Sequence, residues 1–290
     1  MKKRKFGKHE DYISIVGLGG LSIKDSGQKV SNSLVSYAYD KGVNYFDVAP
    51  GYGDAQELMG KSIKQYRNSV FLACKTSSRG FSESLNDLHN SLKVLNTDHF
   101  DLYQLHGMKT RDDFERVTAK NGALEALIKA KHQGKIRYIG FSCHSVLVAN
   151  LLLDYFNFDS ILFPVNWALI LKSKFGLEIL DRCNKTGIAV LAIKTMANTL
   201  WQDKDLREFP NCWYKPLTDK KMIDLAVKFA LSEGIVSFLP PGDSNLFRLG
   251  LDAALSFKRI DKLEIEELRS LAFKSSPIGS KDEIFLGAKM

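Results

Sequence analysis

The sequence has few cysteines, and none of them are spaced as the ligands of a metal centre usually are. Cys74, Cys143, Cys183 and Cys212 lie far apart, and no two form a Cys-x-x-Cys pair. Such pairs are the usual signature of zinc and iron–sulfur sites, so neither kind of site is expected. A few scattered cysteines are typical of free buried thiols in a reducing compartment.

Long apolar stretches are also missing. No apolar run reaches the ~18 residues that a helix needs to cross a bilayer. The basic cluster Lys2-Lys-Arg-Lys5 is not followed by the apolar segment of a signal peptide. The sequence therefore predicts a cytoplasmic location and no membrane partner.

Acidic residues are fewer than basic ones, which leaves a net charge of +8 and a pI near 9.1. Such an excess can favour nucleic acid or a phosphorylated ligand. The basic residues are scattered, and their one cluster, Lys2-Lys-Arg-Lys5, is shorter than the usual basic motif. No nucleic-acid partner is expected, although a nucleic-acid-binding protein stays open as an alternative on charge alone.

Helical patterns and short apolar runs alternate along most of the chain. Runs that are apolar throughout are typical of strands with both faces covered, and regular alternation with helices indicates parallel strands. Strands are predicted at Ile13–Leu18, Val43–Phe46, Val70–Cys74, Phe100–Leu105, Arg137–Phe141, Ser160–Phe163, Ala189–Ile193 and Val236–Leu239. Helices are predicted at Ser31–Lys41, Gln56–Gln65, Glu83–Leu95, Ala123–Gln133, Ser145–Tyr155, Lys174–Lys185, Asp219–Ser232 and Asn245–Phe257.

Eight strand–helix units of this kind close a (β/α)8 TIM barrel, which has about 250 residues and forms one domain. We therefore predict a single α/β barrel domain over residues 1–290. An N-terminal β-hairpin is expected within residues 3–15, and a C-terminal helical tail at Lys262–Phe273, before the Ser-, Pro- and Gly-rich Ser275–Ser280.

Two long loops are expected, at Gly107–Thr118 and Thr195–Pro216, and the second is a candidate lid because it holds four aromatic residues. Ser31 and Asp219 are predicted helix N-caps. The glycines of Gly17-Leu-Gly-Gly20 do not match Gly-x-Gly-x-x-Gly, so no Rossmann loop is predicted.

Four ionisable residues, Asp47, Tyr52, Lys75 and His106, follow the ends of successive predicted strands. In a barrel these strand ends share one rim, where chemistry is placed. A phenol is a weak acid at neutral pH, and a nearby ammonium lowers its pKa. Tyr52 is therefore the predicted general acid, with Lys75 tuning it, Asp47 anchoring the lysine and His106 orienting a substrate oxygen.

Five segments of the chain match sequence blocks of a known family. They are Phe46-Asp-Val-Ala-Pro-Gly-Tyr-Gly53, Leu72-Ala-Cys-Lys-Thr76, Ser91-Leu-Lys-Val-Leu95, Asp101-Leu-Tyr-Gln-Leu-His106 and Gly134-Lys-Ile-Arg-Tyr-Ile-Gly-Phe-Ser142. In these segments the chain resembles the aldo-keto reductases, and the resemblance spans roughly residues 3–257. It implies a (β/α)8 barrel that binds NADPH or NADH without a Rossmann domain, and it implies that Asp47, Tyr52, Lys75 and His106 form the catalytic tetrad.

The motifs Gly-Phe-Ser-x-His, with Ser142, and Pro-x-Asn-Trp, with Asn166, resemble a bacterial branch of this family. Some members of that branch have a C-terminal iron–sulfur domain, for which this chain has too few cysteines. The sequence departs from the wider family at Cys143, Leu162 and Ile193, where Asn, Gln and a ring-stacking Tyr are usual. The resemblance implies cofactor-binding roles for Gly19, Gly20, Leu21, Asp47, Ser142, Asn166, Ile193, Lys194, Asn198, Gly242, Ser244, Arg248 and Asp252.

The segment Leu239–Asn245 resembles the turn that holds the adenosine end of the cofactor. The start of the following helix favours phosphate, and Arg248 stands where an arginine grips the 2′-phosphate of NADPH. Asp243 opposes this phosphate by repulsion. The balance favours NADP, and NAD stays possible.

The resemblance and the four strand-end residues together predict an NAD(P)H-dependent oxidoreductase that reduces an aldehyde, ketone or sugar carbonyl, or runs the reverse reaction. Tyr52, His106 and Trp167 are the predicted substrate-binding residues. The alternative is a cofactor-binding regulatory subunit with little turnover, which the departures around the nicotinamide favour and the intact tetrad opposes. The sequence predicts neither the physiological substrate nor the oligomeric state.

Overall fold

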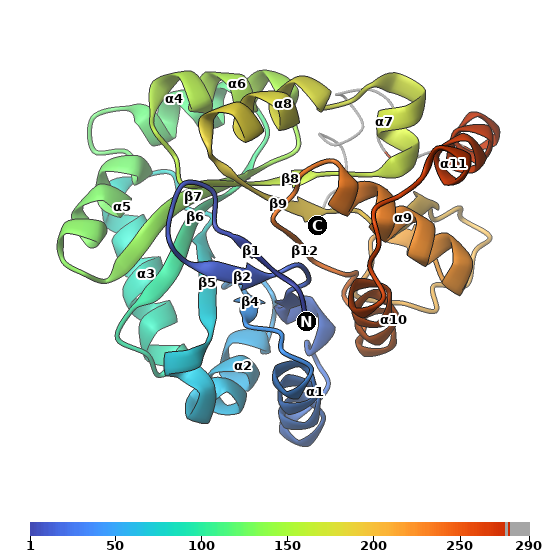
Figure 1. Ribbon diagram of the computed structural model, residues 1–290. Helices are drawn as coiled ribbons and strands as arrows, with labels where there is room; N and C mark the ends of the chain where they lie inside the picture. The colour runs from blue at the N-terminus through green and yellow to red at the C-terminus, as the bar shows by residue number, and fades with distance from the viewer. Residues whose placement is uncertain (276–277, 279–290) are drawn as a thin grey trace.

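A computed structural model describes residues 1–275 and residue 278. Its main sheet has eight parallel strands in the order β12-β9-β8-β7-β6-β5-β4-β3 (Figure 1). The strands are β3 (Leu18–Gly19), β4 (Tyr45–Asp47), β5 (Phe71–Thr76), β6 (Phe100–Met108), β7 (Ile136–Cys143), β8 (Ser160–Pro164), β9 (Ala189–Ile193) and β12 (Ser237–Phe238).

The two edge strands of this sheet meet and close it. Val16, just before β3, pairs in parallel with Phe238 of β12. The amide of Phe238 donates to the carbonyl of Ile15 at 3.1 Å, and the amide of Gly17 donates to the carbonyl of Phe238 at 2.9 Å. Closure pairs backbone groups that an open edge would expose. The predicted (β/α)8 barrel is confirmed.

Helices surround the barrel and cover the outward-facing side chains of its strands (Figure 1). They are α1 (Gln28–Asp40), α2 (Ala55–Ile63), α3 (Phe81–Leu95), α4 (Arg111–Thr118), α5 (Ala123–His132), α6 (Val146–Tyr155), α7 (Trp167–Ser173), α8 (Leu177–Thr186), α9 (Lys220–Ser232), α10 (Ser244–Leu255) and α11 (Lys262–Lys274), with short 3-10 helices η1 (Gly20–Ser22) and η2 (Lys64–Ser69). Within residues 1–275 and 278, no helix is long and apolar enough to cross a membrane.

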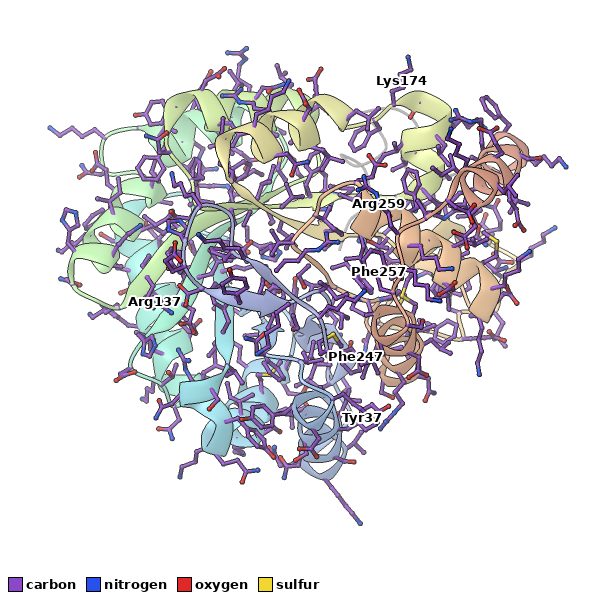
Figure 2. The ribbon with its side chains drawn as sticks, viewed as in Figure 1. Tyr37, Arg137, Lys174, Phe247, Phe257 and Arg259 are labelled. Atoms are coloured by element: carbon purple, nitrogen blue, oxygen red, sulfur yellow. The ribbon has the colours of Figure 1, made fainter. Side chains whose placement is uncertain are left out.

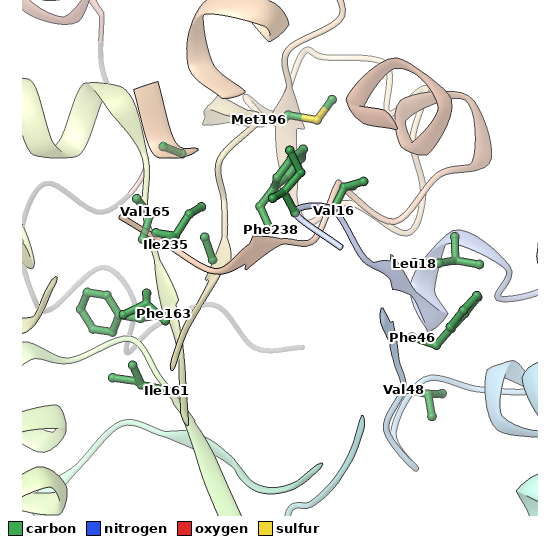
Figure 3. Packing of buried hydrophobic residues seen from close by; sticks show 14 of the residues in the cluster. Val16, Leu18, Phe46, Val48, Ile161, Phe163, Val165, Met196, Ile235 and Phe238 are labelled. Carbon is green, nitrogen blue, oxygen red and sulfur yellow. The ribbon is translucent and has the colours of Figure 1, made fainter. Parts of the chain in front are cut away.

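Alternate residues of a strand point to the same face, so one face of each strand packs against the helices. These outward-facing residues belong to one large buried cluster. Figure 3 labels part of it: Val16, Leu18, Phe46, Val48, Ile161, Phe163, Val165, Met196, Ile235 and Phe238. The helices and strands therefore share a continuous core, and only the two ends of the barrel remain to be covered.

A hairpin covers the N-terminal end of the barrel. Strands β1 (Lys3–Lys5) and β2 (Tyr12–Ser14) pair antiparallel, as the sequence predicts. Phe6 and Ile13 are fully buried against residues at the strand starts, including Phe71. Arg137, labelled in Figure 2, ties the hairpin to the barrel because it pairs with Asp11 and with Asp101 at 2.8 Å each. The C-terminal end of the barrel is therefore the end at which a functional site can form.

The predicted strand Ile13–Leu18 is divided between two sheets. Its first residues belong to β2 of the hairpin, and only Leu18 continues into β3. A run of apolar residues indicates that the segment is buried. It does not indicate whether the segment belongs to one sheet or to two. The prediction of a single strand is therefore wrong.

Two helices form where the sequence pattern predicts none. Helix α4 lies in the predicted loop Gly107–Thr118 and begins with a capping box, in which the side chain of Thr110 accepts from the amide of Asp113. The first four residues of helix α7 are all buried. The sequence there lacks the alternation of apolar and polar residues by which an amphipathic helix is predicted.

The predicted cap at Asp219 is confirmed, since its side chain accepts from the amide of Met222 at 2.9 Å. The predicted cap at Ser31 is wrong, because α1 begins one turn earlier, after Gly27. Ser31 instead lies buried inside the helix, where its hydroxyl is 2.8 Å from that of Ser62 in α2.

The predicted loop Thr195–Pro216 contains a second hairpin, of β10 (Ala197–Leu200) and β11 (Tyr214–Pro216). Ala197 and Tyr214 are buried together with Ile278, which brings one residue of the C-terminal segment against this hairpin. The loop prediction is wrong for the two strands. The rest of Ser275–Ser280, apart from Ser275 and Ile278, lies outside the described residues.

Candidate active site

A buried ion pair lies at the C-terminal ends of β4 and β5. Lys75 pairs with Asp47, and the two side chains are 0% and 2% exposed. The hydroxyl of Tyr45 donates to Asp47 Oδ2 at 3.0 Å, and the amide of Gln104 donates to the same oxygen at 3.2 Å. A buried charge needs such partners, and here one donor from the same strand, β4, and two from β5 and β6 hold the carboxylate in place.

Tyr52 lies above this ion pair, in the turn between β4 and α2. Lys75 Nζ is 5.7 Å from the centroid of its ring. The ring meets that of His106 edge to face, with centroids 5.8 Å apart and planes at 84°. The structure thus brings together the four ionisable residues that the sequence predicts to converge.

Burial and charge act in opposite directions on Tyr52. Burial raises the pKa of its phenol, the Lys75 ammonium lowers it, and Asp47 raises it again, so the pKa lies above its ordinary value. The predicted lowering by Lys75 is present but is outweighed. For Lys75, burial lowers the pKa while Asp47 and Tyr52 raise it, and the net shift is upward. The site holds a protonated phenol beside a charged ammonium.

His106 is held neutral. Burial, followed by the positive charges of Lys75, Arg79 and Lys109, lowers its pKa to about 3. Its Nδ1 lies 3.2 Å from the hydroxyl of Ser77.

His106 also lies at an irregularity of β6. The pairing of β6 with β7 shifts register between Leu105 and Met108, and Gly107 adopts a φ of +64° that favours glycine. Bulges of this kind redirect side chains beside active sites. The irregularity sets the direction in which the side chains from His106 onward leave the strand.

A cavity of ≈160 Å³ opens next to these residues. Nine of the predicted site residues line it: Gly19, Leu21, Asp47, Tyr52, His106, Ser142, Ile193, Lys194 and Gly242. Its wall also contains twelve further residues. Leu239, Pro240 and Pro241 belong to the segment that resembles the adenosine-binding turn, and the other nine are not among the predicted site residues: Ser22, Gly107, Lys109, His144, Leu162, Asn211, Cys212, Trp213 and Tyr214.

Part of this second group comes from the loop between β10 and β11. The Asn211 side chain donates to the carbonyls of Leu21 and Lys24 at 3.5 and 3.4 Å, so this loop reaches across the barrel mouth to η1. Aromatic residues in a long loop are the only sign of this in the sequence. They mark the loop as a candidate lid but do not identify Asn211 or Cys212.

Seven predicted cofactor or substrate residues are not in this cavity wall: Gly20, Asn166, Trp167, Asn198, Ser244, Arg248 and Asp252. Trp167 is 3% exposed and begins α7 within the core. The guanidinium of Arg248 lies 4.3 Å from the ring centroid of Tyr37 in α1, which Figure 2 labels. Asp252 is exposed on α10. Their predicted roles remain predictions.

Asn166 is fully buried, and the chain itself satisfies its side chain. Oδ1 accepts from the amides of Ala168 and Leu169 at 3.0 and 3.1 Å. Nδ2 donates to the carbonyls of Lys194 and Ala197 at 3.0 and 2.9 Å. Asn166 therefore caps α7 and holds the turn that follows β9, in which Lys194 has a φ of +66°.

Lys194 extends from that turn to two aromatic rings. Its Nζ is 4.4 Å from the ring centroid of Trp213 and 4.5 Å from that of Tyr214, distances typical of cation–π contacts. Burial lowers the pKa of Lys194 to about 7. No ion pair among residues 1–275 and 278 involves this ammonium. An anionic ligand would supply the charge that the chain does not.

The wall has features that suit a nucleotide cofactor. A side chain at Gly19 would meet no atom within 4 Å, so the wall is open there, while a Cβ at Gly242 would lie 2.7 Å from Leu21 Cβ. Ser142 Oγ accepts a hydrogen bond from the backbone amide of Gly107 at 2.7 Å. The hydroxyl proton of Ser142 can therefore be donated to a ligand in the cavity. In the described part of the chain, no group of three or more His, Cys, Asp or Glu side chains could hold a metal ion.

Comparison with known proteins identifies the family to which the chain belongs. The chain is 27% identical over 305 aligned positions to the uncharacterized oxidoreductase YqkF of Bacillus subtilis, covering 93% of this chain and 96% of that protein. It is 29% identical over 197 positions to the aldo-keto reductase yakc [NADP(+)] of Schizosaccharomyces pombe, covering 61% and 53%.

A solved structure with the same fold is the holo form of aldo-keto reductase AKR11C1 from Bacillus halodurans, with a TM-score of 0.73 at 21% identity, covering 97% of this chain and 99% of that one. The family model described as "Aldo/keto reductase family" matches residues 15–272. The chain therefore belongs to the aldo/keto reductase family of oxidoreductases.

Proposed function

We propose that this protein is an NAD(P)H-dependent reductase of aldehydes or ketones, or of sugars in their carbonyl form, with Tyr52 as the general acid. One observation carries the proposal. The Lys75 ammonium, buried and paired with Asp47, lies 5.7 Å from the Tyr52 ring, and that ring and His106 face one cavity.

Each residue of the group has a role in this reaction. When bound, the nicotinamide supplies or accepts the hydride. Tyr52 keeps its proton at neutral pH, because its pKa lies above the ordinary value, and donates it to the carbonyl oxygen. Lys75 stabilises the phenolate that remains, and Asp47 keeps Lys75 charged. With Ser77 donating to Nδ1, the Nε2–H of neutral His106 can bind the carbonyl oxygen.

We propose that the cofactor lies along the wall formed by Gly19, Leu21, Ser142, Lys194 and Gly242. Lys194 supports this assignment because it is a half-buried cation facing the cavity and has no carboxylate partner among residues 1–275 and 278. The printed names of two similar proteins, one with NADP(+) and one in a holo form, also support it.

We expect the preference for NADPH over NADH to be modest. Asp243 caps α10 and accepts from the amides of Asn245 and Leu246 at 2.8 and 3.0 Å, so these amides are already bonded. A 2′-phosphate would depend on Arg248, which packs on Tyr37. Titration with NADPH and with NADH measures the two Kd values. If the two values become equal in Arg248→Ala, the preference is due to this arginine.

The proposed function is tested by turnover of para-nitrobenzaldehyde with NADPH, followed by nicotinamide absorbance. Tyr52→Phe removes the proton donor but keeps the ring, so kcat should fall by about 10²-fold or more. The Kd for NADPH should change little. Nucleotide binding by the wild type without turnover would overturn the proposal in favour of a regulatory subunit, and undiminished turnover by Tyr52→Phe would remove Tyr52 from its role.

A further inference from the structure

Lys109 lies in the cavity wall three residues after His106, and the reaction proposed above gives it no role. Of the described residues that line the cavity, Asp47, Lys109 and Lys194 have charged side chains. The carboxylate of Asp47 is already paired with Lys75, which lies behind the wall. The two lysines therefore leave the wall with an excess of positive charge.

The backbone that presents Lys109 is held by a neighbouring arginine. Arg79 donates through Nη1 to the carbonyl of His106 at 3.0 Å and through Nη2 to that of Gly107 at 3.3 Å. Its Nε donates to Asp113 at 2.8 Å. One guanidinium thus joins the end of β6 to the first turn of α4.

Asp113 completes this arrangement from the other side. Its Oδ2 accepts from the backbone amides of Lys109 and Thr110 at 3.0 and 2.9 Å, while its Oδ1 is bound by Arg79. The carboxylate is therefore occupied by Arg79 and by backbone amides, and none of the ion pairs between residues 1–275 and 278 involves Lys109. The backbone that carries Lys109 is therefore held in place at the cavity wall, with the ammonium left for another anion.

The charge of Lys109 acts on the centre of the site. Together with other cations it lowers the pKa of His106 and that of His144, after burial, which is the largest cause for both. Lys109 and His106 also line the same cavity, so the charge of Lys109 can act on a substrate bound against His106.

Lys109 and Lys194 lie on different sides of the barrel mouth. Lys109 follows β6 and Lys194 follows β9, and β7 and β8 lie between these strands in the sheet. Lys194 shares its side of the wall with Gly242, where the cofactor is proposed to lie. Lys109 shares its side with His106, where the carbonyl is proposed to bind.

We propose that Lys109 is a specificity-determining residue that binds an anionic group of the substrate, so that the protein acts on carbonyl compounds that carry a carboxylate or a phosphate. The inference rests on the proposed function and deepens it. A lysine suits this role because its ammonium is a compact point charge with three donors that can follow either anion. An anion bound there keeps its charge through the reaction and contributes to binding in both the ground state and the transition state.

Two pairs of substrates test the inference, and the members of each pair differ in one anionic group. The first pair is para-carboxybenzaldehyde and para-formylbenzamide, which have nearly the same shape. The second is glyceraldehyde 3-phosphate and glyceraldehyde. We expect kcat/KM of the wild type to be at least about tenfold higher for the charged member of one pair, which corresponds to about 1.4 kcal/mol. The pair that shows the preference identifies the anion.

The preference should depend on Lys109. In Lys109→Met the preference for the charged member should fall at least about fivefold. The fall should come mainly from a higher KM for the charged member, because an interaction made equally in the ground state and the transition state acts on KM. Lys109→Arg should keep part of the preference. Lys120→Met, which makes the same change at an exposed lysine outside the cavity wall, should keep the wild-type preference and so control for net charge.

Equal kcat/KM for both members of each pair in the wild type would overturn the inference, while turnover of the neutral members would still support the proposed function. Lys109 would also lose this role if Lys109→Met slowed charged and neutral members equally, or weakened NADPH binding by the same factor. If neither para-nitrobenzaldehyde nor any member of the two pairs is turned over while NADPH binds, the proposed function itself fails and the inference fails with it. If para-nitrobenzaldehyde alone is turned over, the inference fails and the proposed function stands.

Discussion

At the scale of single residues, the site depends on how burial and charge combine. Lys75 is fully buried and stays charged because Asp47 lies against it, whereas half-buried Lys194 has no such carboxylate, and its pKa falls to about 7. The same residue type therefore serves as a permanent charge at one position and as a group that titrates near neutrality at another. This difference can be measured in solution.

Binding of NADPH should weaken as the pH rises above 7. A bound phosphate favours the charged form of Lys194, so binding takes up a proton wherever the free lysine is neutral. The Kd should then rise by up to about tenfold per pH unit between pH ~7 and pH ~9. Neighbouring Cys212 and Tyr214 do not titrate in this range, because burial raises the pKa of both.

Isothermal titration calorimetry at several pH values measures this dependence. In Lys194→Met the slope should disappear, and binding at pH 7 should be weaker. Lys120→Met, at an exposed position, should keep the wild-type slope. A wild-type Kd that does not vary with pH would contradict a role for Lys194 in binding phosphate.

At the scale of secondary-structure elements, side chains between strands and helices position the site. Asn166 joins the start of α7 to the turn after β9, and Arg79 with Asp113 joins the end of β6 to the start of α4. Each connection involves backbone groups that no regular helix or strand satisfies. These connections fix the two turns from which Lys194 and Lys109 enter the cavity.

Asn166→Ala should destabilise the protein by about 2–4 kcal/mol, because it leaves buried amides and carbonyls of two elements without their partner. Urea denaturation measures the loss. Asn157→Ala, at an exposed position, serves as the control and should change the free energy of unfolding by less than about 0.5 kcal/mol. NADPH affinity of the folded variant should also fall, because the turn carrying Lys194 is no longer held. A stable variant with unchanged affinity would show that Asn166 does not position this turn.

At the scale of the whole molecule, the hairpin β1–β2 closes one end of the barrel, and ionisable groups lie at the other. Half-buried His106 is kept neutral there, with a pKa of about 3, and the pKa of His144 is also well below its ordinary value. Burial is the main cause for both. The global stability should therefore depend on pH in the acidic range.

The free energy of unfolding should fall as the pH is lowered from 6.5. Between pH 6.5 and about 3, His106 takes up a proton in the unfolded chain but not in the folded one, so the unfolded state binds more protons and gains relative stability. The slope for one histidine is at most about 1.4 kcal/mol per pH unit.

Urea denaturation at several pH values measures how the free energy of unfolding depends on pH, and His106→Asn should give a smaller slope than the wild type. Exposed His132→Gln should match the wild type. Equal slopes in all three proteins would contradict a neutral His106 in the folded protein.

Much of the barrel could be predicted because its strands are short apolar runs between helical patterns. Ala189–Ile193 is predicted with the bounds that β9 has in the structure. The convergence of Asp47, Tyr52, Lys75 and His106 could be predicted as well, since parallel strands of one barrel end at one rim. Hydrophobic periodicity did not predict α7, because the first four residues of this helix are all buried. It did not predict α4 either, because a capping box and an ion pair, and not an apolar face, hold that helix.

The barrel, the family and the strand ends that carry the tetrad follow from the amino-acid sequence, because each of these depends on local patterns of burial and on residue identities. Three features follow only from the folded chain: burial outweighs Lys75 at Tyr52, Asn166 bonds to the chain, and Lys109 enters the cavity wall. A pKa shift or a hydrogen bond depends on distances between groups far apart in the chain, and those distances exist only after the barrel has closed.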